Sequence, residues 1–114
     1  MLTDATIRSF VREMAEQYRP EKVVLFGSYA AGRATMDSDV DLLVIMPLHD
    51  NPVDKSVEMR MKLRPHFPLD LIVRTPKKIR ERLAMGDDFI KDILAHGKVL
   101  YEARHKGVDP KSRR

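Results

Sequence analysis

Residues 23–45 of the chain read VVLFGSYAAGRATMDSDVDLLVI. Two apolar runs in this stretch enclose a Gly27-Ser28 pair and, after ten further residues, the acidic residues Asp39 and Asp41. The apolar runs are typical of strands that are buried on both faces. The Gly27-Ser28 pair is typical of a sharp turn, here into a short helix. This order predicts an α/β unit in which polar side chains gather at one end of two strands.

Asp39 and Asp41 are candidate ligands of a metal ion. They lie two residues apart, so on a strand their side chains point to the same side. Two carboxylates this close repel each other and resist ionising together unless a cation lies between them. Oxygen ligands of this kind suit magnesium, which binds one or two protein carboxylates together with phosphate oxygens of a substrate.

The Gly27-Ser28 turn predicts contact with an anion. Gly27 has no side chain, so the backbone can turn sharply and approach a phosphate closely. The Ser28 hydroxyl either caps the short helix that follows or turns to a phosphate oxygen. The free amides at the start of that helix favour an anion at the same place. Gly32 and Arg33 are expected to end the helix, and Arg33 is a candidate partner of the phosphates. Together with the acidic pair, the turn favours a site for a nucleoside triphosphate and its magnesium.

Asp70 is the candidate for a third acidic residue of this site. It lies in the run PLDLIV, residues 68–73, where a single acid interrupts an apolar strand. Phosphoryl-type transfer with two metals needs one metal at the attacking hydroxyl and one at the leaving phosphates. A charge beside Leu69, Leu71 and Ile72 is costly to bury unless it is paired or bound to a metal, which favours a catalytic role. The alternative is an aspartate on an edge strand that faces water.

These residues together resemble a known family. The Gly27-Ser28 pair, the ten-residue spacing to Asp39 and Asp41, and a later acid on a strand resemble the nucleotidyltransferase fold of the DNA polymerase beta superfamily. With 114 residues, the chain is similar to the minimal nucleotidyltransferases, and in particular to the MntA-like antitoxins of HEPN–MNT toxin–antitoxin pairs. The resemblance covers roughly residues 5–103, and its specific signal is concentrated in residues 25–45.

The resemblance implies a role for each candidate residue. Asp39 and Asp41 would bind two magnesium ions, and Asp70 would complete the triad and help to deprotonate the acceptor hydroxyl. Gly27 and Ser28 would hold the triphosphate. In the family, a nucleoside monophosphate passes from a triphosphate to a hydroxyl, and pyrophosphate is released. In the antitoxin branch the donor is ATP and the acceptor is a tyrosine of the cognate HEPN ribonuclease toxin, which is thereby inactivated.

The sequence leaves no residues for a separate domain that would hold the acceptor. A second protein, or a second copy of the chain in an oligomer, is therefore expected to provide that surface, which favours a protein adenylyltransferase that silences its toxin. Two other functions stay open. One is a dimeric nucleotidyltransferase that modifies a small molecule of the aminoglycoside kind, although no acidic cluster for a polycationic acceptor lies outside the site. The other is an antitoxin that neutralises its partner by binding alone.

The net charge of +4 is concentrated at the C-terminus. Residues 104–114 hold five basic residues and one acidic residue, which account for the whole excess, so residues 1–103 are balanced. We expect residues 1–103 to form a single nucleotidyltransferase domain and residues 104–114 to form a disordered basic tail. Because the domain has no basic excess and no series of aromatic residues on which bases would stack, nucleic-acid binding is not expected.

Composition also bears on other kinds of site and on location. The chain has no cysteine, and its four histidines show no ligand spacing, so a thiolate or imidazole metal site is not expected. We find no signal peptide and no apolar run long enough to span a membrane. The expected location is a reducing, ATP-containing cytoplasm.

The rest of the chain predicts strands that alternate with helices. The expected strands span residues 22–26, 40–46, 69–74 and 98–101, and the expected longer helices span residues 4–18, 52–64, 76–86 and 88–95. This alternation indicates an α/β or α+β sandwich, with a small mixed sheet of about four strands packed by helices. The residues expected to face the core from the helix over 52–64 are Val53, Val57, Met61 and Leu63, and Met59 and Met85 are expected to fill the core as well.

Overall fold

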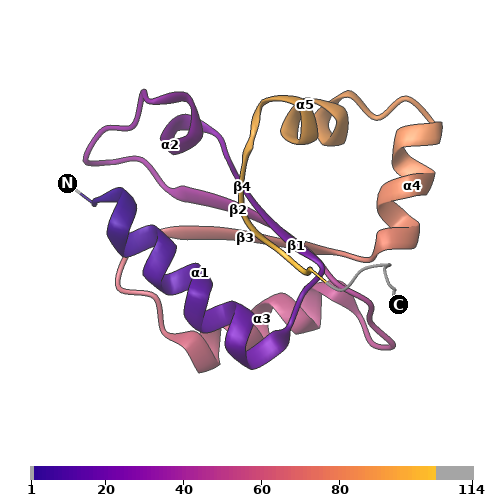
Figure 1. The fold of residues 1–114 in the computed structure, drawn as a ribbon, viewed down its shortest axis with the longest axis horizontal. Coiled ribbons are helices and arrows are strands. Elements are labelled where there is room, and N and C mark those ends of the chain that lie inside the picture. The colour runs from indigo at the N-terminus through magenta and orange to yellow at the C-terminus, as the bar shows by residue number, and fades with distance from the viewer. Residues whose placement is uncertain (1, 105–114) are drawn as a thin grey trace.

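One four-stranded sheet forms the centre of the molecule (Figure 1). The computed structural model describes residues 2–104. The sheet has the strand order β3-β2-β1-β4, in which β1 is antiparallel to β2 and β4, whereas β2 and β3 are parallel. This confirms the predicted mixed sheet packed by helices. The elements are α1 (Asp4–Tyr18), β1 (Lys22–Phe26), α2 (Ser28–Ala31), β2 (Val40–Ile45), α3 (Pro52–Leu63), β3 (Leu69–Arg74), α4 (Pro76–Ala84), α5 (Asp88–His96) and β4 (Lys98–Glu102).

Helices cover both faces of the sheet (Figure 1). α1 and α3 lie against one face, α4 and α5 lie against the other, and α2 lies near the end of β1. Buried side chains fill both layers: Leu42 packs with Met14 of α1 and Met59 of α3, whereas Leu43 packs with Ile79 of α4. Strand β2 is therefore buried on both faces, as its apolar run predicted.

Side chains just before the helices fix where those helices begin. Thr3, Asn51, Thr75 and Asp87 each accept a hydrogen bond from a backbone N–H in the first turn of the helix that follows. Such caps satisfy N–H groups that have no partner within the helix. The observed bounds of the longer helices and the strands agree with the predicted ones to within two residues. Of the helices in residues 2–104, none combines the length and the apolar character needed to cross a bilayer.

The rotation of α3 about its own axis differs from the predicted one. Met59 and Leu63 are buried in the core, whereas Val53, Val57 and Met61 are exposed to between 51 % and 71 %. The prediction that these three residues face the core was therefore wrong. They lie four residues apart and form one apolar stripe, but Met59 and Leu63 form a second stripe of the same spacing, and it is this second stripe that packs against the sheet.

A contact between α3 and β3 is consistent with this rotation. Arg60 Nη1 donates a hydrogen bond to the Leu69 carbonyl oxygen at 2.5 Å, so the Arg60 side of α3 faces the edge of β3.

Met85 was also predicted to fill the core, and this too was wrong, because it is 73 % exposed where α4 ends and the chain turns at Gly86. Of the predicted basic tail, only Arg104 is among the described residues.

Candidate active site

Asp39, Asp41 and Asp70 lie at one end of the sheet. Asp39 lies directly before β2, and Asp41 and Asp70 are the second residues of β2 and β3. In the parallel pair formed by these two strands, Asp41 lies opposite Asp70. Both side chains point to the face that also carries Leu43 and Ile72, which is the face covered by α4 and α5. The third acid therefore lies beside the first two, a juxtaposition that the sequence alone could not show.

The carboxylates of Asp39 and Asp70 act on the carboxyl group of Asp41. Asp41 is partly buried, whereas Asp39 and Asp70 are exposed. Burial raises the pKa of the Asp41 carboxyl, and the negative charges of Asp70 and Asp39 raise it further. None of the three forms an ion pair within residues 2–104. Mutual repulsion without a cationic side chain to relieve it is the condition in which a bound cation stabilises a set of carboxylates.

The side chains fit a hard divalent cation in chemical type. As they stand, no three His, Asp or Glu side chains among residues 2–104 are grouped closely enough to form a metal site. Asp41 is held at the end of a buried strand, whereas the exposed Asp39 and Asp70 have room to reorient their carboxylates. Oxygen donors of this kind and number are those that magnesium takes from proteins.

Gly27 packs directly against Asp41. Its backbone angles, φ +76° and ψ −153°, belong to a region that is essentially restricted to glycine. A Cβ atom at this position would collide with Asp41 Oδ2 and lie 3.1 Å from Asp41 Cγ. The sequence predicted a sharp turn and a close approach to a phosphate; the close approach within the chain itself is to the Asp41 carboxylate.

Ser28 and Arg33 lie at the two ends of the short helix α2. Gly27 occupies the N-cap position, so Ser28 does not cap the helix, and its hydroxyl forms no hydrogen bond within residues 2–104. Gly32 ends the helix in the left-handed conformation at φ +73°, and the Arg33 N–H donates to the Ser28 carbonyl oxygen at 2.9 Å, as predicted for this end. The Arg33 side chain is exposed and has no ion-pair partner in the described part of the chain.

A cavity of about 950 Å³ lies beside this turn, between α2 and α5. Gly27, Ser28 and Arg33 line it on one side, and Asp92 and His96 of α5 line it on the other. The volume is within the range of small-molecule sites. Since Gly27 both lines the cavity and packs against Asp41, the cavity lies next to Asp41, although none of the three aspartates lines it.

α5 contributes residues to this cavity that the sequence analysis did not identify. His96, one of the four histidines without ligand spacing, is exposed at the end of α5 and lines the cavity, and its Nδ1 lies 2.9 Å from Asp92 Oδ1. The ring of Phe89, also in the cavity wall, packs edge-on against Phe26 with 5.8 Å between ring centroids. The four-residue spacing of Asp92 and His96 is a weak signal, because such pairs are common on helix surfaces.

Comparisons with known proteins identify the family of the chain. Residues 7–100 match a protein-family model described as "Nucleotidyltransferase domain". The chain is also 30 % identical over 104 residues to "Putative protein adenylyltransferase MJ0604" of Methanocaldococcus jannaschii, a match that covers 89 % of this chain and 100 % of the archaeal protein.

Two solved structures share the fold. One is a crystal structure named as that of a "putative nucleotidyltransferase" from Sulfolobus solfataricus, with a TM-score of 0.60, 23 % identity, and coverage of 93 % of this chain and 85 % of that one. The other is a toxin–antitoxin crystal structure with AMP-PNP, with a TM-score of 0.54, 19 % identity, and coverage of 86 % and 75 %. From the family match over residues 7–100 and the archaeal relative, the chain belongs to the nucleotidyltransferase domain family and is a nucleotidyltransferase.

Proposed function

We propose that this nucleotidyltransferase is a protein adenylyltransferase that transfers AMP from ATP to a hydroxyl of a partner protein, with magnesium as cofactor. The observation that carries the proposal is the placement of Asp41 opposite Asp70 and against Gly27. The name of the archaeal relative supports a protein as acceptor. The AMP-PNP in the toxin–antitoxin structure of similar fold supports an adenine nucleotide as donor.

In the proposed reaction, the acceptor oxygen forms a bond to the α-phosphorus of ATP. The bond between that phosphorus and the oxygen bridging to the β-phosphate breaks, and pyrophosphate leaves. The hydroxyl proton passes to Asp70, which is exposed on edge strand β3, where a group from another molecule can reach it. The Ser28 hydroxyl and the Arg33 guanidinium, which have no other partners among the described residues, bind the phosphates.

The metal belongs to the same proposal. Asp39, Asp41 and Asp70 would hold two magnesium ions, which supply positive charge to the triphosphate and to the attacking oxygen. The repulsion that raises the pKa of Asp41 supports this assignment, because a bound cation relieves it. The partly buried Asp41 would fix the site, and the exposed Asp39 and Asp70 would adjust to the ions.

For the acceptor, we propose a tyrosine of a HEPN ribonuclease toxin, which the modification would inactivate. The similarity to a toxin–antitoxin structure supports a toxin as partner. The exposure of Asp70 on edge strand β3 supports an acceptor that arrives on a second molecule.

Intact-mass spectrometry tests the proposal. The protein encoded next to this chain is incubated with the chain, ATP and magnesium, and its mass is then measured. We expect a gain of one or more AMP units with the wild type and none with Asp39→Asn. Asp37→Asn is the matched control, because Asp37 is also exposed, lies two residues earlier and has no side-chain hydrogen bond or ion pair within residues 2–104.

Two results would count against the proposal in different ways. An equal mass gain with Asp39→Asn would show that the site is elsewhere. An unchanged mass, with the two proteins still bound to each other, would indicate neutralisation by binding alone.

A further inference from the structure

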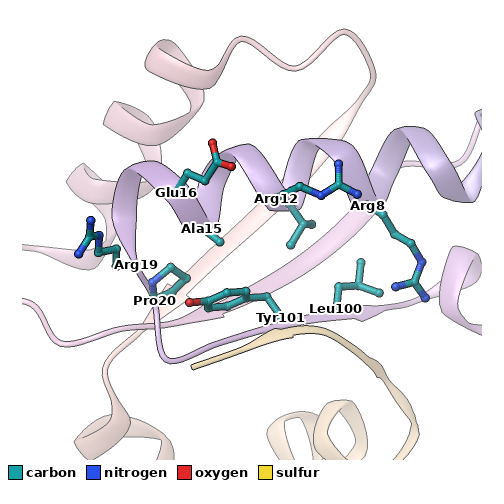
Figure 2. A pocket seen from close by; sticks show the side chains of 9 residues that line it. Arg8, Arg12, Ala15, Glu16, Arg19, Pro20, Leu100 and Tyr101 are labelled. Atoms are coloured by element: carbon teal, nitrogen blue, oxygen red, sulfur yellow. The ribbon is translucent and has the colours of Figure 1, made fainter. Parts of the chain in front are cut away.

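We infer that a groove between α1 and β4 binds an acidic, extended segment of a partner protein. The groove encloses about 620 Å³ (Figure 2). Arg8 and Arg12 of α1 line it together with Arg19, which caps the C-terminal end of that helix, and its floor includes Leu100 and Tyr101 of β4. It lies on the α1 face of the sheet, whereas Asp41 and Asp70 project from the opposite face.

The charge of the groove favours an acidic occupant. Three arginines line it against a single acidic residue, Glu16. Arg8 forms an ion pair with Asp4, with 2.7 Å between Nε and Oδ2, but Arg12 and Arg19 have no ion-pair partner within residues 2–104. Guanidinium groups bind carboxylates through two parallel hydrogen bonds, so these two unpaired arginines, one on α1 and one at its C-terminal cap, suit carboxylate side chains.

The floor of the groove is apolar because of an irregularity in β4. Val23 of β1 pairs with Tyr101 but Val24 pairs with Val99, so Leu100 is an extra residue, as in a β-bulge. In a regular strand, Leu100 and Tyr101 would point to opposite faces, but here both line the groove. The Tyr101 hydroxyl has no hydrogen-bond partner among residues 2–104. The floor therefore suits apolar side chains, with one polar group available to the occupant.

The edge of β4 points to a polypeptide. β4 pairs only with β1, so its other edge carries backbone N–H and C=O groups that no strand of residues 2–104 satisfies. An extended peptide can add to such an edge through main-chain hydrogen bonds while its side chains reach the neighbouring groove. A single tyrosine offers no series of stacking platforms, which disfavours single-stranded nucleic acid. On an added strand only every second side chain faces the groove, so the occupant is a protein segment that carries both acidic and apolar residues among those positions.

This inference rests on the proposed function in one respect: the partner that binds in the groove is taken to be the protein that receives AMP. Binding in the groove is measured without ATP, so an absence of AMP transfer would leave the result unaffected. The probe is a short fluorescein-labelled peptide in which Glu and Leu take turns at every second position, with Ser between them, and fluorescence anisotropy of the peptide with the full chain gives the Kd.

We expect the wild type to bind this peptide and the double variant Arg12→Glu/Arg19→Glu to bind it at least about tenfold more weakly, because repulsion replaces two charge pairs. The matched control is Lys77→Glu/Arg80→Glu on α4, which makes the same charge change at two exposed residues on the other face. Its Kd should stay within about twofold, since charges beyond a Debye length are screened. Circular dichroism confirms that both double variants fold.

Three outcomes would overturn the inference. The first is no binding of the peptide to the wild type. The second is an equal loss of affinity in Lys77→Glu/Arg80→Glu, which would show that the loss comes from the change in net charge and not from the groove. The third is a single-stranded oligonucleotide that binds more tightly than the peptide and loses affinity in Arg12→Glu/Arg19→Glu, which would assign the groove to nucleic acid.

Discussion

The Asp41 carboxyl lies partly buried among Gly27, Asp39 and Asp70. Because burial and two like charges raise its pKa, the folded state holds the Asp41 proton more tightly than the unfolded chain does. The stabilising contribution of this proton is complete below the ordinary carboxyl pKa of about 4 and is lost as the pH rises through the folded-state value. At neutral pH, ionised Asp41 therefore destabilises the fold.

We expect Asp41→Asn to melt a few degrees higher than the wild type at pH 7 in the absence of magnesium. The difference should shrink towards about pH 4, where the wild-type carboxyl is protonated as well. Transfer of AMP should fall by at least about 100-fold, since loss of a residue proposed to bind the metal directly exceeds the effect usual for outer-shell groups. Differential scanning fluorimetry across this pH range gives the sign, and a variant that melts below the wild type at pH 7 would contradict the account.

The contact between Gly27 and Asp41 leads to a second prediction. In Gly27→Ala, the added methyl group displaces the Asp41 carboxylate and the backbone is forced into a strained region, at a cost of about 1–3 kcal/mol. Displacement of a catalytic group by about 1 Å can lower a rate by about 100-fold, so transfer should fall by at least that factor.

Gly27→Ala combines backbone strain with displacement of the Asp41 carboxylate, and Gly32→Ala separates these two effects. Gly32 has a similar φ of +73°, but an added Cβ there meets no atom within 4 Å. This variant should lose stability without a comparable loss of transfer. Urea denaturation and a transfer assay on both variants give the comparison, and equal losses of transfer would show that backbone strain alone is responsible.

Among the elements, α3 shows what a periodic pattern leaves open. Two apolar stripes run along this helix, and its rotation decides which one is buried. Met59 is fully buried whereas Met61 is 71 % exposed, although both are methionines on the same helix. The pair therefore tests the observed rotation with one kind of substitution.

Met59→Ala should lower the free energy of unfolding by about 2–5 kcal/mol, because it leaves a cavity between α3 and the sheet. Met61→Ala should change it by less than about 0.5 kcal/mol, as is usual for exposed sites. Urea denaturation measures both. The opposite ranking would mean that α3 is rotated as the sequence first suggested.

Those parts of the fold that depend on local signals could be predicted from the sequence. The apolar runs predicted the strands, and capping residues such as Asn51 and Asp87 predicted where the helices begin. Asp39 and Asp41 could be grouped because they are neighbours on one extended segment. The pairing of Asp41 with Asp70 and the cavity wall on α5 depend on contacts between distant segments, which no local pattern contains.

Across the whole molecule, the sheet separates the two sites. The three aspartates and the cavity beside Gly27 lie on the α4 and α5 side, and the groove lined by Arg12 and Tyr101 lies between α1 and β4. If the groove holds the partner and the aspartates modify it, binding and transfer should be lost separately in different variants.

This separation can be measured with the partner protein itself. Asp70→Asn removes the group proposed to take the hydroxyl proton, so transfer should fall at least about 100-fold while the Kd for the partner stays within about twofold. Arg12→Glu/Arg19→Glu should instead raise the KM for the partner at least about tenfold and leave kcat at saturation unchanged. Isothermal titration calorimetry and steady-state transfer assays give the two pairs of values. A loss of both properties in both variants would mean that partner binding and chemistry share one surface, in conflict with their positions on opposite faces of the sheet.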